Sequence, residues 1–250
     1  MNQKLAAQIK KAKLEHQKGS AFERYHPTFG GTYIRDAVFG ANDGIITTFA
    51  VIAGVAGANL PLSTVLILGF ANLLADGLAM GLGNYLGSKS EVEYINQERR
   101  MEDWEVKHIP GLERKEIKAI YYRKGFRGQD LSRAVQTITS NKKAWVETMM
   151  VEELGLPAEK SKHPAKNGLA TFAAFALAGL FPLLPYVFGF PRAFNTSIMV
   201  TGLALFSVGS LRAIITKKNW LKSGLEMLAV GAIAATAAFV TGYLINRTLI

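Results

Sequence analysis

Two acidic side chains lie inside stretches that otherwise have the composition of hydrocarbon-embedded segments. Asp43 stands in FGANDGIITTFAVIAGVAGA, and Asp76 stands in GFANLLADGLAMGLGNYLG. Removing a carboxylate from water costs several kcal/mol unless it is paired, protonated or hydrated. An acid inside such a segment therefore indicates a functional site, and a cation is the natural ligand for it.

The second stretch carries further polar groups at helical spacing. Four side chains recur at every fourth position and share one face of a helix: Asn72, Asp76, Met80 and Asn84. Carboxylate and amide oxygens suit hard divalent ions, and a thioether favours a transition metal over magnesium or calcium. The stripe predicts a path for a metal cation. The alternative is that these residues only connect helices or fill space in a bundle.

A second set of candidate ligands lies in a charged region between apolar segments. In QERRMEDWEVKHIPGLERKEIKAIYY, glutamates repeat at spacings of three and four residues on two successive predicted helices. In ETMMVEELGL, a methionine pair precedes a glutamate by three and four residues. Carboxylates drawn together repel one another unless cations lie between them; solvated glutamates paired with arginines and lysines are the alternative. The candidates are Glu102, Glu105, Glu113, Glu116, Met149, Met150 and Glu153.

Five apolar segments are long enough to cross a hydrocarbon core, which needs roughly 20 residues. They are residues 37–58, 62–86, 168–190, 194–211 and 223–245. The chain has no cysteine, which excludes disulfides and thiolate metal sites. The sequence thus predicts an all-α polytopic membrane protein with five transmembrane helices and a cytoplasmic helical metal-binding domain between spans 2 and 3.

The distribution of lysine and arginine predicts the orientation. Seven lie in residues 1–35, sixteen in 87–168 and four in 211–222, against two on the opposite side. Because positive loops stay in the cytoplasm, the N-terminus is predicted to be inside and the C-terminus outside. The net charge of +10 is explained by this topology, and nucleic-acid binding is not expected.

The chain divides into four predicted segments. They are a basic cytoplasmic segment (1–35), spans 1 and 2 (36–87), the cytoplasmic domain (88–166) and spans 3 to 5 (167–250). The first segment suits either a helix on an anionic membrane surface or a solvated tail. Predicted helices in the domain cover 88–107, 112–124, 130–139 and 142–154, with Asp130 and Asn141 as N-caps. Pro182 and Pro185 are expected to bend or end the third span.

Several motifs together resemble the vacuolar iron transporter family. These are RDAVFGANDGIITTFAVIAGVAGA, AMGLGNYLGSKSEVE and TMMVEELGL, in order from about residue 26 to the C-terminus. The resemblance implies a homodimer of five-span subunits that exports iron(II), and often manganese(II), from the cytoplasm in exchange for protons. It implies a metal path at the dimer interface, with Asp43 and Met80 on it. It also implies a cytoplasmic domain that gathers metal through Glu102, Glu105, Glu113, Glu116, Met149 and Glu153.

The chain departs from the family pattern at one position of the second span. Many relatives have an acid before the aromatic residue where this chain has Asn84 before Tyr85, and Asp76, two turns earlier, can supply the charge. The departure bears on the coordination of the metal and on the proton stoichiometry.

The prediction is a proton-coupled exporter of iron(II) or manganese(II), with membrane lipid as its surroundings, no prosthetic group and no enzymatic reaction. The membrane would be the plasma membrane in a prokaryote or the vacuolar membrane in a eukaryote. The alternative is a membrane-anchored metal sensor or buffer without transport. An enzyme is not indicated, because the histidines are scattered and no nucleotide-binding loop is present.

Overall fold

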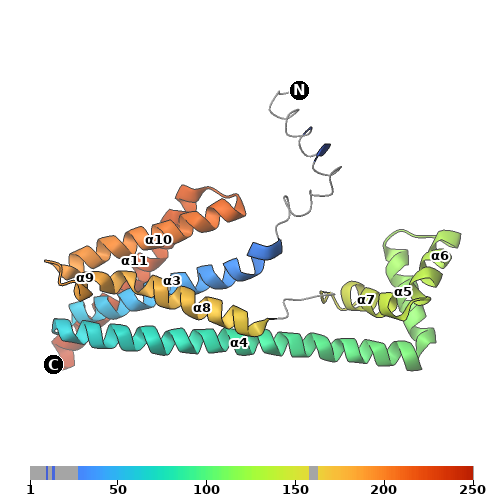
Figure 1. Cartoon of the computed structure of the whole chain (residues 1–250), viewed down its shortest axis with the longest axis horizontal. Coiled ribbons are helices and arrows are strands. Elements are labelled where there is room, and N and C mark those ends of the chain that lie inside the picture. Colours follow the sequence, from blue (N-terminus) through green and yellow to red (C-terminus); the bar gives the residue numbers. More distant parts are fainter. Residues whose placement is uncertain (1–9, 11–12, 15–27, 158–162, 250) are drawn as a thin grey trace. The chain divides into compact units, whose positions relative to one another are not determined.

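The computed structural model describes residues 10, 13–14, 28–157 and 163–249, and every element in these ranges is helical (Figure 1). The predicted surface helix of the N-terminal segment lies mostly outside the described residues. The chain forms two compact units. We call the first the membrane unit (residues up to Tyr85 and from Ala165) and the second the inserted unit (Leu86–Pro164).

The membrane unit contains long apolar helices separated by short turns. They are α3 (Thr28–Gly57), the first part of α4 (Leu62–His108), α8 (Pro164–Gly179), α10 (Ala193–Thr216) and α11 (Trp220–Leu249). Within the described ranges, five helical segments are long and apolar enough to cross a membrane: Tyr33–Gly57, Leu62–His108, Pro164–Val187, Ala193–Ala213 and Trp220–Thr248. Each contains or closely overlaps a predicted span, so the all-helical, five-span prediction is confirmed at this level.

The third span is broken by its prolines, as predicted. Helix α8 ends at Gly179 and is followed by the 3-10 turn η1 (Phe181–Leu183) and the short helix α9 (Leu184–Val187). Pro182 and Pro185 each stand at the first or second position of these elements, where a missing N–H costs no hydrogen bond.

Glycines let α8 approach both α3 and α4. A Cβ atom at Gly40 or Gly44 of α3 would collide with the α8 backbone at Thr171 or Phe175. On α4, Gly81 lies against Gly168 and Phe172 of α8. The small-residue spacing in the first two spans predicts that their helices pack tightly against each other or against a second copy, whereas in the structure these glycines contact α8.

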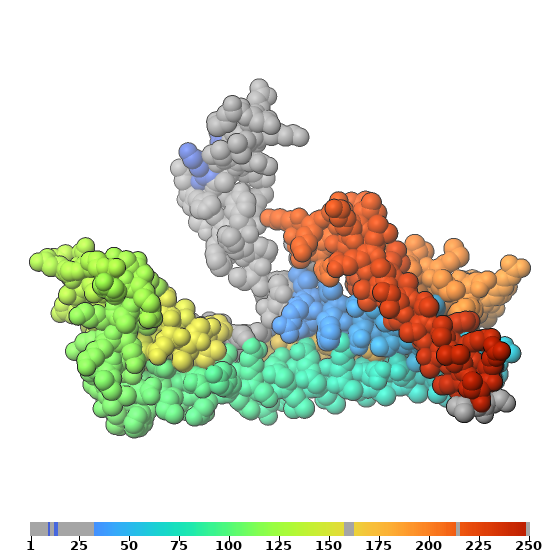
Figure 2. Space-filling model, turned by 180° about the vertical axis from the view of Figure 1, so that it is seen from behind, coloured from blue at the N-terminus to red at the C-terminus, as the bar shows by residue number. Residues whose placement is uncertain are grey.

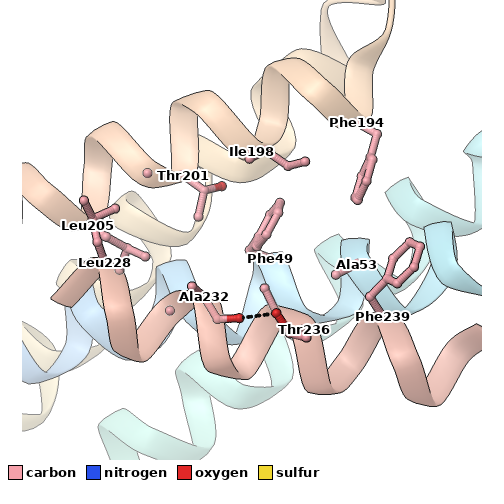
Figure 3. Close-up of a pocket in the computed structure, with 13 residues that line it drawn as sticks. Phe49, Ala53, Phe194, Ile198, Thr201, Leu205, Leu228, Ala232, Thr236 and Phe239 are labelled. Atoms are coloured by element: carbon pink, nitrogen blue, oxygen red, sulfur yellow. Dashed lines mark hydrogen bonds between the residues drawn. The ribbon is translucent and has the colours of Figure 1, made fainter. Parts of the chain in front are cut away.

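Helix α11 packs along α3 on the other side of the membrane unit. Gly54 and Gly57 of α3 meet Gly242 and Phe239 of α11 at backbone contact distance, and Figure 2 shows α11 (red) lying next to α3 (blue). With α10, these two helices line an apolar cavity of about 400 Å³. Figure 3 shows the rings of Phe49, Phe194 and Phe239 around it. No charged side chain lines this cavity, so it offers no carboxylate to a metal ion.

The inserted unit consists of the second part of α4 with three shorter helices, α5 (Pro110–Arg123), α6 (Gly128–Thr139) and α7 (Lys142–Glu152). Its core holds Ile117, Trp145, Met149 and Met150, all at most 4% exposed. The side chain of Asn141 accepts from the N–H groups of Lys143 and Ala144, which confirms it as the N-cap of α7.

Three predictions for this unit are wrong in detail. The second span and the first helix of the domain form one continuous helix, α4. Residues 86–88 contain no proline, and the single glycine, Gly87, costs a helix only about 1 kcal/mol. The helix predicted at 112–124 begins earlier, at Pro110, whose fixed φ is compatible with the first helical turn. Asp130 lies inside the first turn of α6, whose N-cap is Arg127.

Candidate metal site

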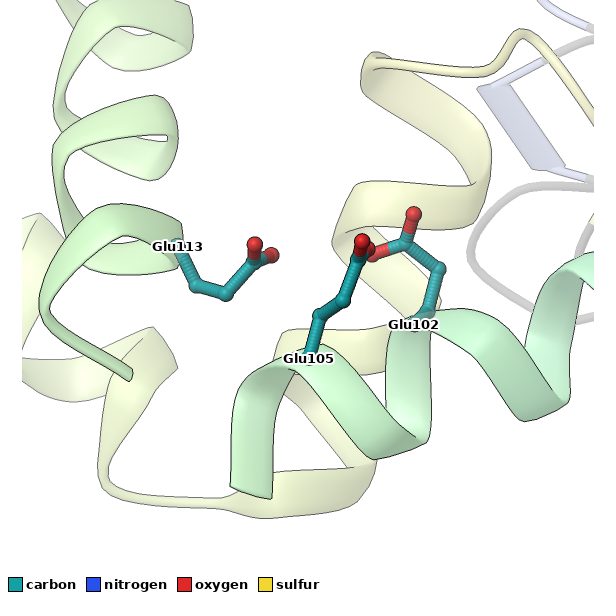
Figure 4. Close-up of side chains that lie close together, drawn as sticks. All are labelled: Glu102, Glu105 and Glu113. Carbon is teal, nitrogen blue, oxygen red and sulfur yellow. The ribbon is translucent and has the colours of Figure 1, made fainter. Parts of the chain in front are cut away.

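Three glutamates of the inserted unit converge where α4 passes into α5. Glu102 and Glu105 stand one turn apart on α4, and Glu113 stands in the first turn of α5. One carboxylate oxygen from each lies within 4.8 Å of the others (Figure 4). Because Pro110 starts α5 immediately after α4 ends, Glu113 lies opposite the last turns of α4. We call this set the glutamate cluster.

Two glutamates of the cluster are buried, and each has a carboxylate oxygen without a hydrogen-bond partner among the described residues. Glu102 is 5% exposed and Glu113 is 3% exposed. In each, Oε2 is buried and has no hydrogen-bond partner in the described part of the chain. A buried carboxylate oxygen without a partner is strongly destabilising, so these oxygens require a proton or a cation.

Burial and mutual repulsion make these carboxyls hard to ionise. Desolvation, followed by the charges of Glu153, Glu113, Glu105 and Glu116, raises the pKa of Glu102 to about 7. Desolvation, followed by the charges of Glu116, Glu105 and Glu153, raises the pKa of Glu113 to about 7. The cluster therefore changes its protonation near neutral pH. A divalent cation would replace the protons, since it neutralises several carboxylates at once.

Two further predicted ligands, Glu116 and Glu153, interact with the glutamate cluster through their charges. Glu116 and Glu153 are exposed, and Glu153 is the C-cap of α7. The pKa of Glu153 is raised by desolvation and by the charges of Glu116 and Glu105, while Arg123 lowers it. Both side chains are thus within electrostatic range of the cluster. Met149 and Met150 are fully buried, and both belong to the apolar core of the unit.

Ion pairing explains other acids of the inserted unit but not the glutamate cluster. Lys142 pairs with Asp103 at 2.6 Å, and Lys124 pairs with Glu152. Arg114, one of the basic residues considered as a partner, has its guanidinium 5.7 Å from the centre of the Trp145 ring. Among the described residues, no ion pair reaches Glu102 or Glu113. The interpretation of these two as ordinary solvated, paired glutamates is therefore not supported.

The membrane unit brings two of its acids close together. Asp43 is half-buried on α3, and its charge interacts repulsively with that of Asp76 on α4. Asp76 is exposed on the surface of the single chain, and Met80 is half-buried one turn further along α4. Asp36 is buried, and its Oδ1 lies 3.8 Å from Arg35 Nε, whereas no ion pair in the described part of the chain reaches Asp43 or Asp76.

Asn84 is positioned by α8. Its amide nitrogen lies 2.7 Å from Thr171 Oγ1 and 3.3 Å from the carbonyl oxygen of Asn167, and it donates to both. These hydrogen bonds link α4 to α8, which is the helix-connecting role considered as an alternative for this stripe. Asn42 was not among the predicted site residues, but its Oδ1 is buried and has no hydrogen-bond partner in the described chain. Its position beside Asp43 was the only signal.

Comparison with known proteins places the whole arrangement in one family. The VIT family model matches residues 34–243. The chain is 37% identical over 232 residues to a vacuolar iron transporter of Toxoplasma gondii, covering 88% of this chain and 77% of that protein. It is 36% identical over 211 residues to vacuolar iron transporter 2 of Oryza sativa subsp. japonica, covering 84% and 86%. It is 35% identical over 212 residues to vacuolar iron transporter 1 of Arabidopsis thaliana, covering 84% of each. With five candidate spans and a match over most of its length, this chain belongs to the VIT family.

Proposed function

We propose that this protein exports iron(II) from the cytoplasm across a vacuolar or plasma membrane in exchange for protons. The observation that carries the proposal is the glutamate cluster, whose buried carboxylate oxygens have no partner in the described chain. Membership of a family whose relatives are named iron transporters indicates which cation it receives. Manganese(II) accepts the same oxygen and thioether ligands and is the second candidate cargo.

In this proposal the inserted unit collects metal in the cytoplasm. The distribution of lysine and arginine supports this orientation, because the basic segments would all lie on the cytoplasmic side. The ligands would be the glutamate cluster with Glu116, Glu153 and a thioether from Met149 or Met150. Since the cluster changes its protonation near pH 7, it can take up and release a cation under cytoplasmic conditions.

Asp43 and Asp76 would receive the cation in the membrane, with Met80 and Asn84 beside them on α4. A carboxylate cannot hold a proton and a metal ion strongly at the same time, so protons arriving from the acidic side displace the metal. Loading one therefore expels the other. A proton gradient directed into the cytoplasm would drive metal out of it.

We also propose a homodimer in which a second copy covers the exposed face of α4. Asp76 is exposed on this face, and a Cβ atom at Gly83 would meet nothing within 4 Å. A carboxylate facing lipid is costly, whereas one facing a path between two subunits can be hydrated or metal-bound. Small residues at the same face would let the two helices approach closely.

Cysteine cross-linking tests the dimer directly because the chain has no cysteine of its own. Ala79 is exposed one turn after Asp76, so Ala79→Cys should give covalent dimers in membranes upon oxidation. Ser207→Cys, an almost isosteric change at an exposed position of α10, is the matched control and should remain monomeric. Equal cross-linking of both variants, or of neither, would contradict a dimer built on α4.

Transport is tested with the full-length protein in proteoliposomes that have an acidic interior. Iron(II), kept reduced, is added outside, and a metal-quenched dye and a pH dye report the lumen. We expect iron entry coupled to loss of luminal protons, slower or comparable manganese entry, and no calcium entry. Folded protein that binds iron but moves none under any gradient would instead be a membrane-anchored metal buffer.

A further inference from the structure

A second cavity of the membrane unit combines an apolar wall with two arginines. It has a volume of about 550 Å³ and lies where α3 begins, α10 ends and α11 begins. Its apolar wall includes Val38, Phe39 and Val230. Its charged side consists of Arg35, Arg212 and one acid, Glu226, so the positive charge prevails. We call it the arginine cavity. It shares no lining residue with the apolar cavity between Phe49 and Phe239.

Both arginines retain donors for an anionic ligand. The Arg35 side chain is 87% exposed, and its Nε makes a long contact of 3.8 Å to Asp36 Oδ1. Arg212 donates from one terminal nitrogen to Glu226 Oε2 at 2.9 Å. Because a guanidinium carries five N–H donors, each arginine can still bind phosphate oxygens.

The apolar wall faces the surroundings of the membrane unit rather than its interior. Phe39 is 59% exposed and Val230 is 50% exposed. Both belong to candidate spans, so in a membrane this wall borders hydrocarbon. A ligand that fits both sides must therefore be amphiphilic, with an acyl chain along the wall and a negative group at the arginines.

The end of the unit that holds this cavity is its basic end. Lys218 and Lys222 lie in the α10–α11 turn and the first turn of α11, close in sequence to Arg212 and Glu226. Basic clusters at helix ends attract anionic lipids, and basic pockets between helices bind their phosphate head groups. Charge complementarity therefore favours an anionic phospholipid over a zwitterionic one.

We propose that the arginine cavity is a binding site for one anionic phospholipid, whose phosphate contacts Arg35 and Arg212 while an acyl chain lies against Val38, Phe39 and Val230. Bound lipid would bridge α3, α10 and α11. Asn42 lines the same cavity, next in sequence to Asp43, so occupancy would also constrain the helix that carries Asp43. The site is independent of whether the protein exports iron.

The test measures binding of phosphatidylglycerol and of phosphatidylcholine with the same acyl chains to the purified full-length protein. Native mass spectrometry counts the bound lipids, and thermal unfolding follows stabilisation, which rises with occupancy of a site present only in the folded state. We expect preferential binding of phosphatidylglycerol. Arg35→Gln/Arg212→Gln should weaken it roughly thirtyfold, since each basic residue near an anionic lipid contributes about fivefold.

Matched arms decide between this site and simpler explanations. Lys218→Gln/Lys222→Gln removes the same charge from the same end, but neither lysine lines the cavity, so this variant should lose clearly less of the preference than the arginine variant. Val230→Trp, at a half-exposed position, should fill the wall and lower lipid binding without changing any charge, which keeps the test valid if the arginine variant unfolds. Equal losses in both charge variants, unchanged binding to Val230→Trp, or full competition by inorganic phosphate would each overturn the proposal.

Discussion

Asp43→Asn is expected to reduce iron(II) flux into acid-loaded proteoliposomes by about 100-fold or more, the upper end of what loss of a metal-site group costs. The amide keeps the size of the side chain but has neither the negative charge nor the titratable proton that exchange requires. Asp43 is half-buried and interacts with Asp76 across two helices, so an asparagine would leave a site with one charge where two are proposed. The measurement is the initial rate of luminal dye quenching, together with luminal pH.

Two comparisons make this result specific to the path. Asp36→Asn makes the same change seven residues earlier on the same face of α3, at an acid that lies 3.8 Å from Arg35. This variant should transport iron at close to the wild-type rate. The Asp43→Asn protein should still bind iron in its inserted unit, because the glutamate cluster is untouched. Wild-type flux in Asp43→Asn would remove Asp43 from the path, and equal loss in Asp36→Asn would point to a general effect on folding.

The spans could be predicted because their signal is local. A run of about 20 apolar residues has few alternatives to a membrane helix, and the prolines after Gly179 break the third span as their chemistry requires. The partner of each glycine could not be predicted, because small residues show that a backbone approaches without showing which one. Gly44 of α3 therefore meets Phe175 of α8 rather than the neighbouring span.

The glutamate cluster was partly visible in the sequence. Helical spacing placed Glu102 with Glu105 on one face, and the Pro110-Gly111 turn between the two predicted helices allows the face with Glu113 to converge on it. The degree of burial could not be predicted, because it depends on how α5 and α7 pack on α4. Glu102 and Glu113 are buried, whereas Glu116, three residues after Glu113 on α5, is exposed. Spacing alone treats these three glutamates alike.

The second large effect concerns the response of the inserted unit to pH and metal. Folding raises the pKa of Glu102 and of Glu113 from 4.5 to about 7, so the metal-free folded state binds more protons than the unfolded chain between these values. The contribution of these two carboxyls to stability is therefore fully present below about pH 4.5 and is lost as the pH rises through 7. A divalent cation reverses this trend, because it binds the ionised carboxylates that are otherwise repelled.

Glu102→Gln/Glu113→Gln should therefore have two opposite effects. Without metal, the variant should melt at a higher temperature than wild type at pH 8, because two buried charges are gone. With iron(II) under anaerobic conditions, it should lose the stabilisation seen in wild type, and its iron affinity should fall by about 100-fold or more. Wild-type affinity should itself fall below pH 7 by about tenfold per pH unit for each proton displaced.

Tryptophan fluorescence isolates this unit within the full-length protein. Trp104 and Trp145 belong to the inserted unit, and Trp145 is 4% exposed in its core, so a Trp220→Phe background removes the third tryptophan of the chain. Glu93→Gln/Glu147→Gln is the matched control, since both of these glutamates lie 3.8 Å from lysines on helix surfaces. If the control loses metal-induced stabilisation as fully as the cluster variant, binding is diffuse. If Glu102→Gln/Glu113→Gln is less stable than wild type without metal at pH 8, then these glutamates have stabilising partners within the protein and do not form an unoccupied cation site.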